Sequence, residues 1–269
     1  RDRHVLSIGD VMECNKISNS KRESFNKCRL KYKFNYVNRF EETDPGNTGA
    51  LHFGSFIHEI FEKGVGAVKV EQLWSIANKI KDKYKFPASY NNKIEICLKN
   101  FLRFNAQLPK DSLVEHHFQE QLTPDINHEG YIDRIIKAPN GTLIVIDYKT
   151  SKREKNKFEL FSDTQGKSYV YAAHKLTNTP IRKISFAHYY PLTNNLVSAT
   201  YTEQAIFQHV RDIVEDVKKI RGCKEDDLYP TKNEFCDWCS YKSLCNLYND
   251  PTTVAGRINE CKVRPKRKR

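Results

Sequence analysis

The stretch at residues 143–151, LIVIDYKTS, has the pattern of a buried β-strand that ends in two opposite charges. Side chains of a strand alternate between its two faces, so Asp147 and Lys149 project from the same face. A buried charge is costly unless it is paired, hydrogen-bonded or bound to a metal. The acid and the lysine at this strand end therefore mark a candidate functional site.

A second apolar segment, at residues 130–138, precedes this strand, and Asn140-Gly141 lies between the two. Asn-Gly between apolar runs is typical of a β-hairpin, so two antiparallel strands are predicted. The hairpin can bring Asp133 near Asp147, and facing carboxylates repel unless a cation lies between them. Oxygen ligands of this kind suit Mg²⁺ or Mn²⁺. Two alternatives without chemistry stay open here, a buried Asp147–Lys149 pair and a surface Asp133–Arg134 pair.

The rest of the chain has helical spacing before this hairpin and a mixture of strands and helices after it. For example, Phe53, Ile57, Ile60 and Phe61 fall on one helical stripe. Helices are predicted near 18–38, 51–65, 70–84, 90–107, 165–176 and 203–221, and strands near 112–122, 130–138, 142–150, 184–192 and 196–201. This order predicts an α+β fold around a mixed central sheet.

Composition places the chain among folded proteins with a polyanionic partner. Hydrophobic residues make up 39% and aromatic residues 12% of its 269 residues, which is ample for a core. No apolar run reaches the roughly 20 residues of a membrane-spanning helix, so we expect an intracellular protein, cytoplasmic or nuclear. Lys and Arg exceed Asp and Glu by 45 to 33, a net charge of +12. With many aromatic residues, this charge favours nucleic acid, although composition alone also allows a role in solubility only.

Two more motifs join the hairpin. GSFIHE supplies Gly54 and His58 on a predicted helix, and QGKSY places Gln165 and Tyr169 four residues apart on another. In this order the motifs resemble those of the PD-(D/E)XK nuclease superfamily, in its RecB-like branch, over roughly residues 18–250. Ile132 stands where the superfamily name has proline. The resemblance implies an α/β/α restriction-endonuclease-like core with a helical N-terminal region.

The resemblance also implies roles for these residues. Asp133, Asp147, His58 and the backbone carbonyl of Tyr148 would bind one or two Mg²⁺ or Mn²⁺ ions. Such ions lower the pKa of bound water and stabilise charge on a phosphate.

Three further residues complete the implied catalytic set. Lys149 would orient or deprotonate the attacking water, and Gln165 and Tyr169 would contact the DNA backbone or this lysine. Glu115, on the first predicted strand, is either a supporting acid behind the metal ligands or a solvated glutamate.

Eight cysteines are unevenly spread, and Cys236, Cys239 and Cys245 are clustered with the spacing C-x₂-C-x₅-C. Three such thiolates can share one metal centre, with a fourth ligand from Cys28, Cys223, Cys261 or a histidine.

In iron–sulfur members of this nuclease branch, an N-terminal cysteine joins three C-terminal ones, which implies Cys28 in the segment SFNKCRLKYKFNYV. Arg29 replaces the proline common there. The expectation is a structural [4Fe–4S] cluster, with zinc in the same cage or free thiols as alternatives.

These observations predict one nuclease domain over 1–269, with a helical part at 18–110, a catalytic core at 111–221, the cysteine cluster at 222–250 and a basic tail at 251–269. The expected activity is that of a metal-dependent DNA exonuclease acting on single strands or ends, with replication or recombination proteins as partners. A non-catalytic nucleic-acid-binding subunit with the same fold is the alternative. No G-x-x-x-x-G-K-[ST] motif is present, so ATP hydrolysis is not expected.

Overall fold

The computed structural model describes residues 14–44 and 49–265. These residues form two compact units. The sheet unit comprises residues 49–120 and 129–211, and the cysteine unit comprises the described parts of 1–48, 121–128 and 212–269. None of the helices within the described ranges is long and apolar enough to cross a membrane.

The sheet unit is built around strand β4 (Leu143–Tyr148), whose partners on its two sides run in different directions. Strand β3 (Ile126–Lys137) pairs with β4 in antiparallel fashion, while β5 (Ile184–Tyr190) pairs with it in parallel. Strand β6 (Asn195–Thr200) continues the sheet beyond β5, and β2 (Ser112–Thr123) pairs with β3. The predicted mixed sheet and the α+β class are therefore confirmed.

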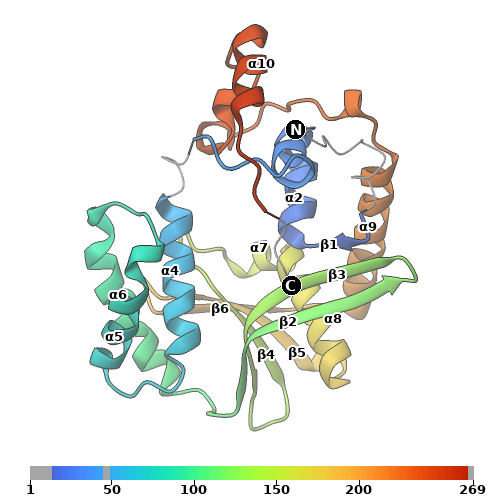
Figure 1. The fold of residues 1–269 in the computed structure, drawn as a ribbon. Helices are drawn as coiled ribbons and strands as arrows, with labels where there is room; N and C mark the ends of the chain where they lie inside the picture. The colour runs from blue at the N-terminus through green and yellow to red at the C-terminus, as the bar shows by residue number, and fades with distance from the viewer. Residues whose placement is uncertain (1–13, 45–48, 266–269) are drawn as a thin grey trace. The chain divides into compact units, whose positions relative to one another are not determined.

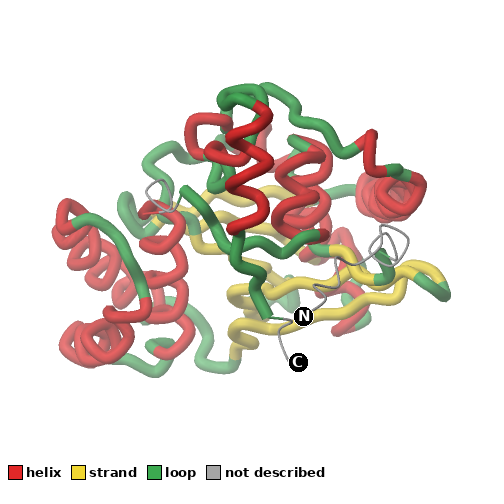
Figure 2. The backbone as a smooth tube through the Cα atoms, turned by 45° about the horizontal axis from the view of Figure 1, so that its top comes forward, coloured by secondary structure: helices red, strands yellow, loops and turns green. Residues whose placement is uncertain are grey.

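Helices of the sheet unit cover both faces of the sheet (Figure 1). Ile146 and Tyr148 join the core formed with α4 (Gly49–Lys63), α5 (Val70–Ile80) and α6 (Asn91–Asn105). Figure 2 shows these three helices as red coils grouped beside the strands. Leu143 and Val145, on the other face, pack in the core with α8 (Thr164–Thr177). Strand β4 is buried on both sides, and its end is held in place by both cores.

The predicted turn at Asn140-Gly141 is present. Gly141 has φ +80°, a conformation that favours glycine, and its amide donates to the Ala138 carbonyl at 2.9 Å. The register that follows sets Arg134 opposite Ile146 and Lys137 opposite Leu143. The tight turn at Gly141 helps to fix this register, because the loop of a hairpin determines which residues pair.

The cysteine unit packs the N-terminal helices against the C-terminal part of α9 (Glu203–Gly222). The core includes Phe25 of α2 (Asn19–Lys27), Tyr32 of α3 (Arg29–Tyr32), and Val217 of α9. A two-residue strand, β1 (Lys16–Ile17), pairs in parallel with Asn127 and His128. After α9 the chain has only short helical turns, η6 (Glu225–Asp227), η7 (Cys236–Trp238) and η8 (Lys242–Leu244), until α10 (Pro251–Glu260).

The helix predicted over 18–38 is wrong as one continuous element. It breaks at Cys28, whose φ of −160° and ψ of 109° are extended, and it ends as a π-helix, η1 (Lys33–Val37). The side-chain amide of Asn233 donates to the Lys27 carbonyl at 3.1 Å, and Leu30 donates its amide to the Tyr229 carbonyl at 3.1 Å. These partners, about 200 residues away in sequence, replace the helical hydrogen bonds lost at the break.

Two helices were not predicted, although each has a start signal. Asn156 caps α7 (Lys157–Phe161) in a capping box with Glu159, and Asp250 caps α10, which has Pro251 in its first turn. Residues 251–260 of the expected basic tail are therefore a helix. Val263 forms a β-bridge with Phe40, and residues 266–269 lie outside the described part of the chain.

Candidate active site

The acidic residues of the sheet unit meet where the pairing of β3 with β4 ends, as the hairpin predicted. The paired residues end with Arg134 opposite Ile146, and Asp133 and Asp147 are the next residues along each strand. Asp133 is 8% and Asp147 is 2% exposed, so both carboxylates are buried. Asp133 Oδ2 accepts a hydrogen bond from the backbone amide of Tyr148 at 2.6 Å, which ties the two strand ends together.

His58 reaches the same strand ends from helix α4. The buried stripe of α4, which includes Ile57, faces the core and directs His58 toward Tyr148. His58 Nε2 lies 2.7 Å from the Tyr148 carbonyl oxygen, and Nδ1 lies 3.3 Å from Asp133 Oδ1. Burial lowers the pKa of His58, but the Asp133 carboxylate more than offsets this and raises the pKa to about 9. At neutral pH a cationic imidazolium therefore lies between a carboxylate and a carbonyl.

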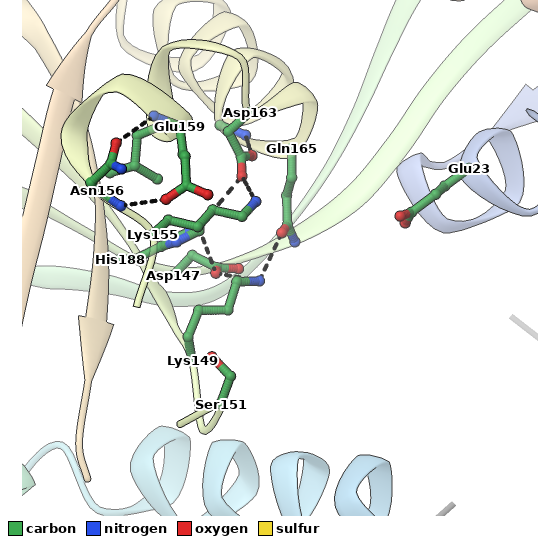
Figure 3. A network of polar contacts seen from close by, with 12 residues as sticks. Glu23, Asp147, Lys149, Ser151, Lys155, Asn156, Glu159, Asp163, Gln165 and His188 are labelled. Carbon is green, nitrogen blue, oxygen red and sulfur yellow. Dashed lines mark hydrogen bonds and ion pairs between the residues drawn. The ribbon is translucent and has the colours of Figure 1, made fainter. Parts of the chain in front are cut away.

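Lys149 is held by the two neighbours that its strand and helix α8 provide. Its Nζ lies 2.6 Å from Asp147 Oδ2 and donates to Gln165 Oε1 at 2.9 Å (Figure 3). Gln165 Nε2 in turn donates to the Tyr169 hydroxyl at 2.8 Å, one turn further along α8. Burial lowers the pKa of Lys149, but the Asp147 charge outweighs burial and raises it, so the amine is cationic at neutral pH.

Burial disfavours the charged form of two carboxyl groups at this site, those of Asp147 and Glu115. Burial raises the pKa of Asp147 to about 6 against the effect of Lys149, and the Asp133 charge adds to the rise. Burial also raises the pKa of Glu115 to about 7, again with help from Asp133. Glu115 has φ +46°, an uncommon conformation for a glutamate, so its backbone is strained beside this group of acids.

These residues fit a divalent cation in their chemistry. Among residues 14–44 and 49–265, no three His, Cys, Asp or Glu side chains already form a group that could hold a metal ion. The carboxylates of Asp133 and Asp147 instead form ion pairs with His58 and Lys149. Carboxylates, a carbonyl oxygen and an imidazole are ligands of Mg²⁺ and Mn²⁺ sites, and a cation would relieve the raised pKa of Asp147.

One of the alternatives without chemistry is wrong. Arg134 is 1% exposed and does not form a surface pair with Asp133. Its Nη1 donates to Asn105 Oδ1 at 2.6 Å and its Nε to Ser112 Oγ at 3.2 Å. The other alternative, a buried Asp147–Lys149 ion pair, is present and is compatible with a catalytic role.

The acid in the GSFIHE motif does not join the site. Glu59 accepts hydrogen bonds from Lys83 at 2.7 Å and from the Tyr84 hydroxyl at 2.5 Å, and it also pairs with Lys63. Burial raises the pKa of Glu59, but these three donors lower it to about 2. Glu59 therefore ties α4 to the turn after α5.

Sequence reasoning missed three polar residues beside Asp147, namely Lys155, Asp163 and His188 (Figure 3). Asp163 is the N-cap of α8 and could have been found from the capping pattern before QGKSY. His188 lies inside the apolar strand ISFAHYY, where nothing in the periodicity distinguishes it from a structural histidine. Burial lowers the pKa of His188 to about 4, so its ring is neutral at neutral pH.

The four cysteines expected to share a metal centre all belong to the cysteine unit, but within residues 14–44 and 49–265 they do not form a group that could hold a metal ion as they stand. Cys28 lies at the break between α2 and α3, Cys236 begins η7, and Cys239 and Cys245 follow η7 and η8. All are free thiols of intermediate exposure. Burial raises the pKa of Cys239, and the charges of Cys28 and Cys245 raise it further. Burial also raises the pKa of Cys245, and the charges of Cys28 and Cys236 add to that rise.

The thiols of Cys239 and Cys245 therefore lie within electrostatic range of Cys28. Of the other cysteines, Cys261 packs against the same small core as Cys239. Cys14 packs in the core of α2 and α9, Cys97 lies in the core of the sheet unit, and Cys261 donates to the Arg257 carbonyl at 3.3 Å.

Comparison with known families agrees with the motifs and with the fold. Residues 16–246 match the profile of the PD-(D/E)XK nuclease superfamily. The chain belongs to this superfamily. The match covers both the acidic hairpin and the three clustered C-terminal cysteines.

Two curated relatives support the RecB-like branch. The chain is 26% identical over 248 residues to a subunit of the ATP-dependent helicase/deoxyribonuclease of Streptococcus agalactiae serotype III, and 28% identical to its counterpart in serotype Ia. These alignments cover 85% of this chain but only 21% of each relative. The chain therefore spans about a fifth of the length of these proteins.

A solved structure supports the fold. The crystal structure of a putative exonuclease from Eubacterium rectale superposes with a TM-score of 0.52 and 14% sequence identity. The superposition covers 90% of this chain and 93% of that one. At this identity the likeness concerns the arrangement of helices and strands alone.

Proposed function

We propose that this chain is a divalent-metal-dependent deoxyribonuclease, an exonuclease acting on single-stranded DNA or DNA ends in recombination, repair or replication. The observation that carries the proposal is the meeting of Asp147 and Lys149, at the end of β4, with Asp133 of the neighbouring strand and with His58. A protein that only binds nucleic acid has no need of buried acids that burial and mutual repulsion disfavour. The net charge of +12 suits a polyanionic substrate.

The ligands of the proposed Mg²⁺ or Mn²⁺, one or two ions, are Asp133, Asp147, His58 and the Tyr148 carbonyl oxygen. Such an ion, when bound, lowers the pKa of water and stabilises negative charge on a phosphate. Asp133 is already oriented by the Tyr148 amide, which donates to it at 2.6 Å. Binding of the ion would replace the pairs that His58 and Lys149 make with the two carboxylates.

Lys149 is the proposed group that attracts the charge developing on the scissile phosphate and orients the attacking water. It remains cationic because Asp147 outweighs burial, and Gln165 fixes the direction of its ammonium group. Tyr169 holds Gln165 through the hydrogen bond from the glutamine amide. In this proposal Gln165 and Tyr169 act first by placing the lysine, and Glu115 lies behind the ligands as a further acid.

We also propose that Cys28, Cys236, Cys239 and Cys245 hold a [4Fe–4S] cluster, with zinc as the alternative in the same cage. Burial and the charges of neighbouring thiols raise the pKa of Cys239 and Cys245, with Cys28 acting on both, which supports a shared site. The role of the cluster would be structural, because the segment after α9 has only short helical turns to hold it.

The partners of the chain are inferred from its relatives. Their name, helicase/deoxyribonuclease, supports a nuclease that works beside a protein that unwinds DNA. Residues 1–269 contain no G-x-x-x-x-G-K-[ST] motif, so we expect the unwinding and the ATP hydrolysis to come from outside these residues.

The test is a cleavage assay with end-labelled single-stranded, end-labelled double-stranded and closed circular DNA in the presence of Mn²⁺. The proposal expects loss of the linear substrates, retention of the circle, and loss of activity in Asp147→Ala. Binding without cleavage by the wild-type protein would favour the alternative, a non-catalytic subunit. Cleavage of the circle would replace the exonuclease with an endonuclease.

A further inference from the structure

The imidazole of His188 lies between two buried carboxylates of the sheet unit. Its Nε2 atom is 3.5 Å from Asp147 Oδ2 and 3.9 Å from Asp163 Oδ2 (Figure 3). His188 is 0% exposed, so it cannot touch DNA. Within the described residues Nε2 makes no hydrogen bond of standard geometry, and these two carboxylates are its ionic neighbours.

The other nitrogen of the ring shows which way the imidazole faces. His188 Nδ1 lies 3.2 Å from the Tyr190 hydroxyl, and that hydroxyl oxygen accepts the backbone amide of Lys155 at 2.8 Å. The hydroxyl hydrogen is thereby available to Nδ1. The ring therefore turns Nδ1 toward Tyr190 and Nε2 toward Asp147 and Asp163.

The two carboxylates belong to the two elements that build the acidic site. Asp147 ends β4, and Asp163 is the N-cap of α8, where its Oδ1 accepts the Gly166 amide at 2.8 Å. Helix α8 carries Gln165, the residue that holds Lys149. Strand β4 and the start of α8 are thus joined twice, once through Lys149 and Gln165 and once through His188.

We propose that His188 is a positioning residue that holds the Asp147 carboxylate and the first turn of α8 in fixed relation to each other. In doing so it sets the affinity of the acidic site for a divalent cation, an inference that rests on the proposed metal-dependent function. Side chains that orient a metal ligand commonly contribute a factor of about 10–100 to metal affinity.

The sheet unit offers a matched control in His209. It is also buried, at 3% exposure, and Ser168 Oγ lies 2.8 Å from its Nε2. Replacement of either histidine removes a buried imidazole and its polar contacts. Only His188 contacts an acid of the site.

The test measures Mn²⁺ binding by electron paramagnetic resonance without DNA, together with thermal unfolding. His188→Ala is expected to weaken Mn²⁺ binding by about 10- to 100-fold. His188→Gln, which keeps an amide donor, should restore most of the affinity. His209→Ala should lower the Tm and leave Mn²⁺ affinity unchanged.

Unchanged Mn²⁺ affinity in His188→Ala would overturn the proposal, as would an equal loss in His209→Ala. A wild-type protein that binds no Mn²⁺ would overturn it as well. If the wild type binds Mn²⁺ but cleaves no DNA, the proposed nuclease fails while the affinities still decide the role of His188. If His188→Ala does not fold, two other variants replace it in the test, His188→Gln and Asp163→Asn, the second of which keeps the oxygen that caps α8. Unchanged Mn²⁺ affinity in both variants would overturn the proposal.

Discussion

The acidic site and the cysteine site of this protein are held together in opposite ways. Asp133 lies within β3 and Asp147 near the end of β4, and β4 is buried on both faces by the cores of the sheet unit. The four cysteines instead lie at the ends of short helical turns and at a break between two helices. Regular backbone therefore orients the acids, whereas loops present the thiols.

The two sites therefore differ in how far their geometry depends on a bound ion or cluster. The acids form ion pairs with His58 and Lys149, so the acidic site has a defined geometry without any ion. A four-thiolate site that loops present gains its geometry largely from the metal bonds. We therefore expect loss of the ion to affect activity in the sheet unit, and loss of the cluster to affect the fold in the cysteine unit.

The largest expected effect is on activity alone. Lys149→Met removes the cation that we place beside the scissile phosphate and should lower kcat by about 10²–10³-fold. The iron content of the protein should be unchanged, because Lys149 belongs to the sheet unit. Steady-state cleavage and iron analysis of the same preparation check both outcomes, and a variant with wild-type kcat would remove Lys149 from the mechanism.

The acidic site was predictable from sequence because it depends on short-range rules. The Asn-Gly turn indicates the hairpin and its register, so the meeting of Asp133 and Asp147 follows. The helical stripe of α4 likewise follows from the spacing of Phe53 and Ile57. These elements are consistent at every level, from local propensity to the core.

Other features depend on partners far along the chain. Nothing near Cys28 predicts the helix break, because the groups that compensate it come from Asn233 and Tyr229. His188 was not singled out, because its place between Asp147 and Asp163 results from the parallel pairing of β4 and β5. Local periodicity contains no information on such contacts.

The next effect tests the cysteine side of the comparison. Cys239→Ser should reduce iron from about four atoms per chain to near zero. It should also increase hydrogen exchange over residues 223–250, while exchange in α4, α5 and α6 stays unchanged. Cys97→Ser is the control, because Cys97 is buried in the other unit and should leave iron content unchanged. A colourless wild-type protein that contains zinc would contradict the iron–sulfur cluster but would still support one metal site shared by the four cysteines.

A smaller effect concerns the packing that supports Gln165. A Cβ atom on Gly166 would lie 2.3 Å from the Tyr201 hydroxyl and 2.4 Å from Phe186 Cδ1. Gly166→Ala should therefore cost about 1–3 kcal/mol of stability, measured by denaturant unfolding. The matched control is Gly222→Ala at the end of α9, where an added Cβ meets nothing within 4 Å. Equal losses of stability in the two variants would mean that close packing around Gly166 does not hold the start of α8 in place.

The smallest expected effect concerns an ion pair between α2 and α9, which tests how much contacts between helices stabilise the cysteine unit. Arg22 Nε of α2 lies 2.5 Å from Asp216 Oδ2 of α9, and Asn26 donates to the same oxygen at 3.0 Å. Burial raises the pKa of Asp216, but these donors outweigh it and the pKa falls below its usual 3.8. A carboxyl with a lowered folded pKa stabilises the fold above pH 3.8, and this stability is lost as the pH falls through the folded pKa.

Arg22→Gln should therefore cost about 1 kcal/mol at pH 7, and the difference from wild type should shrink below about pH 4. Urea unfolding at pH 7 and at lower pH checks this, and Lys218→Gln is the control, because its pair with Glu215 is 63% and 59% exposed. That variant should change stability by less than about 0.5 kcal/mol at either pH. A loss of several kcal/mol in Arg22→Gln, with iron content unchanged, would break the comparison. The cysteine unit would then be held by its helices, as the sheet unit is by its strands, and the cluster would not be needed for the fold.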